Sequence, residues 1–214
     1  MAKQVKRRYS SAQRAQQAAE TRRAVLVAAR ELFEEKGYVA VGVGEVARRA
    51  GVNLDTVYRA VGRKPQLLLA AIDQILGSSD QPVPAEQRDY VIAVRAAATA
   101  GEKLRTYADA LGTLMPRAAP LFAALREAAP ADPECAALDR HISERRAANM
   151  RLLAAELRTA GQVREELDDD RVADLIWSTN SPQWFDLVTS RGWSAAEYAD
   201  ALYDLWSRVL LTSP

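Results

Sequence analysis

From residue 84 onward, apolar residues recur at helical spacing, and no segment alternates in the manner of a β-strand. Prolines and glycines such as Pro116 separate the segments, and Asp132, Asp168 and Ser194 stand where helix N-caps are expected. The expected helices are residues 85–98, 100–115, 117–128, 132–160, 168–179, 182–191 and 194–211. Residues 21–36 and 65–76 carry similar apolar stripes, so the pattern predicts an all-α fold.

Residues 42–64, GVGEVARRAGVNLDTVYRAVGRK, are expected to form two short helices joined by a turn. Val43 and Val46 share a helical face, and Gly51 follows where a left-handed backbone ends a helix without a Cβ clash. Asn53 then lies at the N-cap position of the second helix. This pattern is typical of a helix-turn-helix, whose second helix enters the major groove of DNA, although an ordinary helical hairpin fits it too.

The segments on either side carry a family resemblance. In order, the chain shows TxxxxxxAAxxLFxxxGY from Thr21, VxxVAxxAGVxxxTVY from Val43 and KxxLLLA from Lys64. Over residues 21–75 it resembles the tetracycline-repressor (TetR) family. The resemblance implies a three-helix DNA-binding domain, placed at residues 21–76, and a C-terminal helical ligand-binding and dimerisation domain, placed at residues 84–214. The turn formers of residues 77–84 mark the boundary between them.

The resemblance also implies which residues meet double-stranded DNA. Tyr58 and Lys64 occupy positions that contact phosphates in the family, whereas the segment from Asn53 to Arg59 reaches base edges. Phosphate contacts set the register and base contacts set the choice of sequence. The residues predicted to bind DNA are Arg22, Gly42, Asn53, Leu54, Asp55, Thr56, Tyr58, Arg59 and Lys64.

The chain departs from the family pattern at three places. Leu54 and Asp55 replace small or basic residues, Val61 replaces an aromatic residue, and Gly42 replaces a Ser or Thr. An Asp accepts a hydrogen bond from cytosine N4 and a Leu contacts a thymine methyl group. The departures therefore indicate a different operator. The alternative is a helical ligand-binding or scaffold protein whose sequence-specific DNA binding is weak or lost.

Charge is distributed unevenly along the chain. Residues 1–76 hold 14 Lys and Arg against 7 Asp and Glu, whereas the remainder holds 15 against 21, giving net charges of +7 and −6. A basic N-terminal part on an acidic body fits phosphate binding at one end. Residues 1–20 form a basic arm that either reaches DNA or has no role; its first cations are Lys3, Lys6, Arg7 and Arg8.

Enzyme chemistry lacks its signatures. The sequence has no GxxxxGK followed by Ser or Thr, no GxGxxG, no GxSxG and no HExxH. The single histidine, His141, gives poor support to a catalytic triad, and the single cysteine, Cys135, excludes an internal disulfide. The acidic run at residues 168–170 is interpreted as helix-start charge rather than a metal site. We therefore expect no enzymatic activity, no cofactor and no metal. With neither a secretory signal nor a membrane-length apolar run, a cytoplasmic location is expected.

Aromatic residues concentrate late in the chain. Trp177 and Trp184 lie in LIWSTNSPQWFDLV, where Pro182 interrupts the helical pattern. Such a break suits the wall of a cavity for a small apolar or amphipathic effector, although aromatic residues suit a dimer interface equally well. The residues predicted to bind the ligand are Tyr107, Leu111, Phe122, Asn149, Met150, Trp177, Asn180 and Trp184.

The resemblance further implies a homodimer in which the last long helices of two copies form a four-helix bundle. Core burial within one subunit would give the same apolar periodicity. The residues predicted at the interface are Val172, Ile176, Leu187, Tyr198, Leu202, Leu205, Trp206 and Val209. Two-fold symmetry would match a palindromic operator with half-sites about 34–36 Å apart. The predicted function is a dimeric transcriptional repressor released from DNA by the effector.

Overall fold

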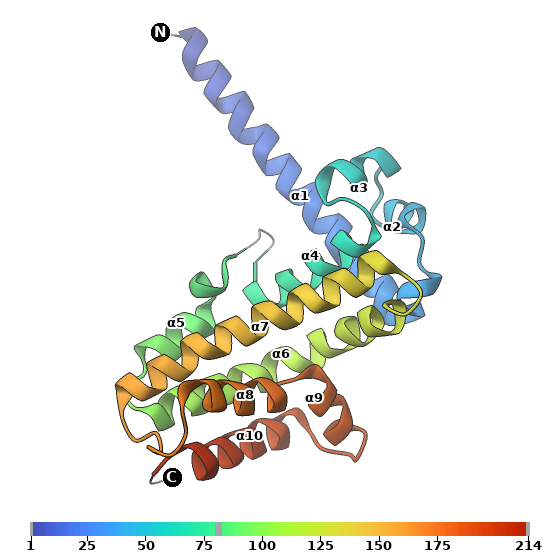
Figure 1. The fold of residues 1–214 in the computed structure, drawn as a ribbon. Coiled ribbons are helices and arrows are strands. Elements are labelled where there is room, and N and C mark those ends of the chain that lie inside the picture. The colour runs from blue at the N-terminus through green and yellow to red at the C-terminus, as the bar shows by residue number, and fades with distance from the viewer. Residues whose placement is uncertain (1, 80–82, 213–214) are drawn as a thin grey trace. The chain divides into compact units, whose positions relative to one another are not determined.

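The computed structural model describes residues 2–79 and 83–212, with side chains from residue 13 onward (Figure 1). The chain folds as two compact units, residues 1–83 and 84–214. The predicted all-α class is confirmed, since the described residues form helices and a single isolated β-bridge between Val163 and Leu211. The side chains of the basic arm at Lys3, Lys6, Arg7 and Arg8, and residues 80–82 of the predicted linker, lie outside the described part.

The first unit contains four helices along its described backbone, α1 (Ala2–Ala40), α2 (Val43–Arg49), α3 (Leu54–Ala60) and α4 (Lys64–Gly77). Gly37 interrupts α1 with a φ of 75°, at the position where the sequence predicts the helix end. Upstream, α1 extends well beyond residue 21, as the good helix formers between Ala12 and Ala19 allow. The core of this unit joins all four helices through fully buried side chains, among them Leu26, Leu32, Val46, Val57, Leu68 and Ile72.

The second unit surrounds one long helix, α6. Its elements in chain order are a 3-10 turn η1 (Ala85–Gln87), α5 (Asp89–Ala96), α6 (Ala100–Ala128), α7 (Pro133–Ala160), α8 (Asp169–Thr179), α9 (Pro182–Thr189) and α10 (Ala195–Leu210). Helices α5, α7, α9 and α10 all pack against α6, and α8 packs against α7 (Figure 1). The single helix predicted over residues 85–98 is wrong, because η1 and α5 replace it.

The helix break predicted at Pro116 is also wrong. Helix α6 runs through both Pro116 and Pro120, although proline in a helix removes one backbone hydrogen bond and costs about 3 kcal/mol. Both rings are exposed and lie four residues apart on the solvent side, while the neighbouring Met115 and Ala119 are buried. Packing of the buried face therefore keeps the helix continuous.

The three predicted N-caps are formed by side-chain hydrogen bonds. Asp132 accepts from the backbone N–H groups of Glu134 and Cys135, which start α7. Asp168 and Ser194 cap α8 and α10 in the same way. These bonds satisfy backbone donors that the first helical turn leaves without partners.

Helices α6 and α10 approach each other closely at Gly112. A Cβ atom built on this glycine would lie 2.9 Å from the Cβ of Ala199 and 3.0 Å from the carbonyl oxygen of Ala195. Only glycine allows this separation, so Gly112 sets the packing distance between the two helices.

Candidate functional site

A tight turn joins α2 to α3. Gly51 adopts a left-handed φ of 68°, and its N–H donates to the Arg48 carbonyl oxygen at 3.2 Å. The N–H of Val52 donates to the Ala47 carbonyl oxygen at 3.0 Å. This pair of bonds is a Schellman motif, which ends a helix and satisfies its last carbonyl groups. The two helices and their turn form the helix-turn-helix that the sequence predicts.

Buried valines and surface ion pairs hold the motif against α1. Val46 and Val57 have no exposed surface. Arg49 of α2 binds the two carboxylate oxygens of Glu35 at 3.0 and 2.9 Å, which lowers the pKa of Glu35. Lys36 of α1 pairs with Glu45 of α2 and lowers the pKa of that carboxyl too. The charges of Arg49 and Lys36 are therefore used inside the unit.

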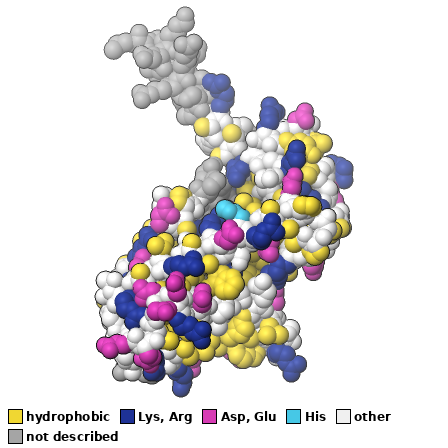
Figure 2. Space-filling view, viewed as in Figure 1, with side chains coloured by type: hydrophobic (Ala, Val, Ile, Leu, Met, Phe, Trp, Pro, Cys, Tyr) yellow, Lys and Arg dark blue, Asp and Glu magenta, His cyan; other side chains and the backbone are white. Residues whose placement is uncertain are grey.

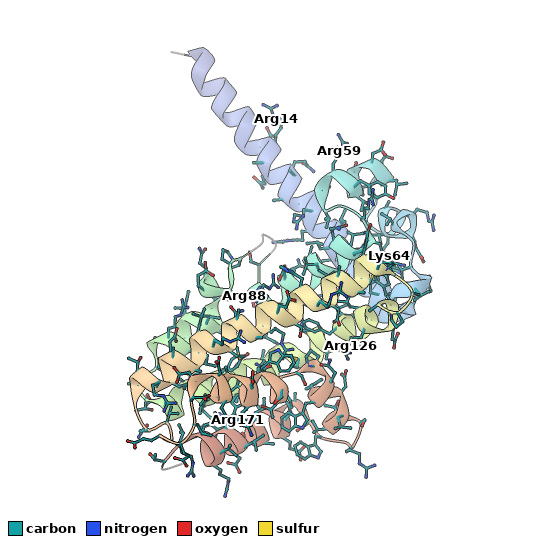
Figure 3. All side chains as sticks on the ribbon, in the orientation of Figure 1. Arg14, Arg59, Lys64, Arg88, Arg126 and Arg171 are labelled. Carbon is teal, nitrogen blue, oxygen red and sulfur yellow. The ribbon has the colours of Figure 1, made fainter. Side chains whose placement is uncertain are left out.

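The opposite side of α3 faces solvent. Tyr58 is 45 % exposed and Leu54 42 % exposed, and Asp55 and Arg59 are also exposed. Arg59 extends from this helix, as Figure 3 shows, and its Nε lies 3.4 Å from the Asp55 carbonyl oxygen. One side of α3 thus packs on the unit through Val57, and the other presents aromatic, charged and apolar groups together.

Other residues predicted at DNA have structural contacts. Arg22 donates a hydrogen bond to the carbonyl oxygen of Ala60, which ties the end of α3 to α1. The Lys64 ammonium lies 3.2 Å from the Val39 carbonyl oxygen and 4.2 Å from the centre of the Tyr38 ring. These contacts position both cations beside the motif, and their role at DNA stays a prediction.

The starts of α2 and α3 complete the surface. Gly42 is the exposed N-cap residue of α2 and supplies no hydroxyl group. Asn53 is the N-cap residue of α3, as expected, but its side chain makes no capping hydrogen bond. Thr56 is half-buried. The N-cap positions of both helices, Gly42 and Asn53, are exposed to solvent.

A buried polar cluster lies inside the second unit. Asn180, the C-cap residue of α8, is only 2 % exposed. Its side-chain N–H donates to the Tyr107 hydroxyl at 2.9 Å and lies 3.0 Å from the Met150 sulfur. Its carbonyl oxygen accepts from Arg146, whose guanidinium also donates to the Trp177 carbonyl oxygen at 3.0 Å. Helices α6, α7 and α8 therefore meet at one polar point within an apolar core.

Aromatic rings surround this point. The Tyr107 ring stacks with those of Tyr90 and Trp206, whose centres lie 6.2 and 5.7 Å away. The Trp206 indole N–H donates to the Thr179 hydroxyl at 2.8 Å. A second group of rings consists of Trp184 and Phe185 against Tyr198.

Burial sets the charge states in the cluster. It raises the pKa of the Tyr107 and Tyr198 hydroxyls, so both remain protonated at neutral pH. It lowers the pKa of the Arg146 guanidinium, which nevertheless remains a cation because Arg side chains do not lose their proton in proteins. Two buried polar atoms, the Trp177 indole nitrogen and the Tyr198 hydroxyl oxygen, find no hydrogen-bond partner among the described residues. The cluster therefore combines neutral tyrosine hydroxyls with the cation of Arg146. Two of its polar atoms remain able to form a hydrogen bond.

The structure brings together part of the predicted ligand site. Tyr107, Met150 and Asn180 touch one another. A further predicted residue, Trp177, is contacted by Arg146. Leu111 and Trp184 belong to the same core or pack against it. Two predicted residues, Phe122 and Asn149, lie outside that core, buried and half-buried respectively.

Sequence reasoning missed Arg146. It lies four residues before Met150 on α7, and side chains at that spacing share a helix face. That spacing was the available signal. A charged side chain in a helix is ordinarily interpreted as a solvated one. His141, by contrast, is exposed on the surface, where it is the cyan group of Figure 2.

The predicted dimer interface requires a correction. Five of its eight residues are at most 1 % exposed and belong to the core of their own unit, so they present no surface to a second copy. The prediction is wrong for these five: Val172, Ile176, Tyr198, Leu202 and Trp206. Helical periodicity marks a buried face but does not say which neighbour buries it. Leu187, Leu205 and Val209 are exposed.

Neither a metal site nor a membrane span is found in the described part. No group of three or more His, Cys, Asp or Glu residues is placed to hold a metal ion in residues 13–79 and 83–212. Over the same described chain, no helix is both long and apolar enough to cross a membrane.

Comparison with known proteins places this geometry in context. Residues 25–71 match the model of the family described as bacterial regulatory proteins, tetR family. Over 83 residues the chain is 36 % identical to the HTH-type transcriptional regulator BetI of Rhizobium meliloti, and this match spans 39 % of the chain and 37 % of that relative. The family model thus matches within the first unit, and the chain spans little more than a third of this relative's length.

Solved structures extend the similarity to the whole fold. A protein from Saccharomonospora viridis, described as a transcriptional regulator in complex with choline, superposes with a TM-score of 0.68 at 19 % identity, over 90 % of this chain and 98 % of that one. The complex of SmeT with triclosan gives a TM-score of 0.67 at 16 % identity, over 90 % of this chain and 92 % of that one. At these identities the likeness establishes the fold alone.

Proposed function

We propose that this chain, of which residues 25–71 match the tetR family of bacterial regulatory proteins, is a dimeric, ligand-responsive transcriptional repressor. In this proposal it binds a palindromic operator through α3 and leaves the DNA when a small apolar or amphipathic effector enters the second unit. A cytoplasmic location, where operator DNA lies, is part of the proposal.

The observation that carries the proposal is the two-sided character of α3. Val57 fixes the helix to its unit, while Tyr58 and Arg59 remain exposed beside an ordered turn. A helix held in this way can enter a major groove without rearrangement of its support. The exposed Leu54 and Asp55 give it apolar and acidic groups for base edges.

Lys64 and Tyr58 supply the proposed phosphate contacts. The Lys64 ammonium is held against the Tyr38 ring and the Val39 carbonyl oxygen. A preplaced cation loses less side-chain entropy when it meets a phosphate. Asn53, Thr56 and Arg59 are the proposed base-reading residues, whereas Arg22 supports the end of α3.

The proposed effector site is the polar cluster around Asn180. Two proteins of similar fold are described as complexes with choline and with triclosan, which supports a small-molecule site in this chain. An apolar pocket with a few placed polar groups is the usual form of such a site. To release DNA, the effector must bind the DNA-incompetent state more tightly, and a difference of 1–3 kcal/mol would change operator affinity about 5- to 150-fold.

The proposed dimer uses the exposed remainder of the predicted interface. Leu205 and Val209 lie four residues apart on α10, and Leu187 lies on α9. Sedimentation velocity tests this part: Leu205→Glu together with Val209→Glu should turn a dimer into a monomer that keeps its helical circular dichroism spectrum. A double variant that still sediments as a dimer would refute this interface.

Fluorescence anisotropy with a labelled random duplex tests DNA binding itself. We expect binding that weakens steeply with salt, because cations released from phosphates drive it. Selection from a random-sequence pool should then yield a palindrome. A helical scaffold protein would show almost no binding at any salt concentration, and that outcome would refute the proposed regulator.

A further inference from the structure

Arg146 is a cation without a carboxylate partner. Its guanidinium donates to two neutral oxygens, those of Asn180 and the Trp177 backbone, and within the described residues it forms no ion pair. The nearby Arg126, by contrast, pairs with Asp186 at 3.1 Å. Asp139 is the acidic group that acts on Arg146 through space, opposed by Arg126. A half-buried positive charge with so little compensation is costly unless something neutralises it.

Two further polar groups near Arg146 are unused. The guanidinium carbon lies 5.8 Å from the centre of the Trp177 ring, whose buried N–H meets no acceptor in the described part of the chain. The Tyr198 side chain is fully buried with an unbonded hydroxyl, and the charge of Arg146 acts on this hydroxyl. An N–H and an O–H that both lack acceptors call for an oxygen-rich group.

The aromatic rings do not offer a site for a cation. A quaternary ammonium group binds against open ring faces. The Tyr107 ring already stacks with the rings of Tyr90 and Trp206, and the Tyr198 ring is contacted by Trp184 and Phe185. The positive charge of Arg146 would also repel such a ligand.

Building on the proposed effector site, we propose that the effector of this protein is an anion, a carboxylate on an apolar body. Arg146 binds its carboxylate, and the Trp177 N–H and Tyr198 O–H donate to the same group. The apolar body lies among the core side chains around Met150 and Leu111. Arg pairs with carboxylates through two parallel hydrogen bonds, which gives both affinity and orientation.

Isothermal titration calorimetry of the full chain tests the inference. Two series of probes are used, and the members of a series differ only in the head group, which is anionic, neutral or cationic. One series is octanoate, octanol and octyltrimethylammonium; the other is phenylpropionate, phenylpropanol and phenylpropyltrimethylammonium. We expect at least one carboxylate to bind at least about tenfold more tightly than its alcohol, with no binding of the ammonium compounds. An alcohol or ammonium compound that binds as tightly as its carboxylate, or no binding by either carboxylate, overturns the proposal.

Variants of one helix supply the matched comparison. Arg146→Gln should remove the preference for the carboxylate over the alcohol, whereas Arg151→Gln should keep it, because Arg151 is an exposed residue of α7 that pairs with Asp170. If Arg146→Gln does not fold, Arg146→Lys and Trp177→Phe take its place, and each should weaken carboxylate binding several-fold. A preference that survives all of these substitutions overturns the assignment to Arg146.

DNA binding, measured in parallel by anisotropy, separates this inference from the proposed function. Release of DNA by an alcohol or ammonium probe would leave the regulator intact and refute the anionic effector. A chain that binds carboxylates but no DNA would refute the regulator and keep the anion site.

Discussion

The side-chain amide of Asn180 donates a 2.9 Å hydrogen bond to the hydroxyl of Tyr107, and this bond joins the end of α8 to α6. Both residues are buried, so solvent water does not replace the hydroxyl as an acceptor for Asn180 if the hydroxyl is removed. A buried donor that loses its partner costs about 1–3 kcal/mol. The bond therefore contributes to stability as well as to the shape of the proposed effector site.

We expect Tyr107→Phe to lower the free energy of unfolding by about 1–3 kcal/mol, because Asn180 loses its hydroxyl acceptor. Urea denaturation followed by circular dichroism measures this change. Tyr203→Phe is the control, since Tyr203 is half-buried and contacts the Arg105 guanidinium through its ring, 5.0 Å away. Equal losses in the two variants would contradict a special role for the Tyr107 hydroxyl.

Gly112 and Gly101 form a matched pair on α6. An added Cβ at Gly112 would meet Ala199 at 2.9 Å, whereas one at Gly101 would meet Leu211 at an ordinary 3.8 Å. Alanine in a helix gains up to about 1 kcal/mol over glycine, but overpacking costs about 1–3 kcal/mol. Gly101→Ala should therefore raise the unfolding temperature and Gly112→Ala should lower it. A Gly112→Ala variant as stable as Gly101→Ala would mean that α10 moves aside at no cost.

Local signals in the sequence predict the helix ends well. Asp132, Asp168 and Ser194 act on backbone groups within three residues, so their effect is readable without the fold. Gly51 marks its turn for the same reason. Pro116 misleads, because the packing of distant helices outweighs its local cost.

Relations between distant segments are harder to predict. The apolar stripe that includes Tyr198 and Trp206 was visible, but whether its own unit or a second copy covers it depends on the fold. Tyr107 and Asn180 were both predicted at the ligand, and the structure joins them across 73 residues of sequence. Arg146 was missed because the residues it contacts, Trp177 and Asn180, lie more than 30 positions later in the sequence.

Gly51 should tolerate substitution poorly despite open space around it. Chain neighbours aside, an added Cβ would meet no described atom within 4 Å, but the φ of 68° costs a non-glycine residue about 1–2 kcal/mol. Gly51→Ala should therefore lower the unfolding temperature of the first unit. Gly44→Ala, which also meets open space but lies within helix α2, should raise it. If both variants behaved alike, the left-handed turn would not be the cause.

Acid should weaken the starts of α6 and α10. The pKa of Glu102 is lowered because its carboxylate accepts from the Thr99 and Ala98 N–H groups, and the pKa of Glu197 is lowered by Ser194. A carboxyl with a lowered folded-state pKa stabilises the fold above its unfolded value, 4.5, and loses that effect as pH falls through the folded value.

As the pH is lowered from about 5.5 to 3.5, the unfolding temperature of the double variant Glu102→Gln and Glu197→Gln should therefore fall less than that of the native chain. Thermal denaturation across this range measures the difference. Glu127→Gln, at an exposed position late in α6, is the control and should follow the native chain. Parallel acid profiles for the native chain and the double variant would contradict a role for these two carboxylates.

Lys64 and Arg59 should have separable effects on DNA binding, provided that the proposed function holds. Lys64→Gln removes a proposed phosphate contact, so it should weaken binding to every sequence and reduce the slope of log affinity against log salt by about 1. Arg59→Ala removes a proposed base contact and should change the preferred sequence, with a cost of about 1–3 kcal/mol on the best operator.

Anisotropy salt series on the selected operator and on a random duplex distinguish the two effects. Lys36→Gln is the matched control for Lys64→Gln, because it removes a lysine of the same unit whose charge is already paired with Glu45. Its salt slope should equal that of the native chain. If Lys36→Gln reduces the slope as much as Lys64→Gln, the effect comes from net charge, and the assigned phosphate contact is wrong.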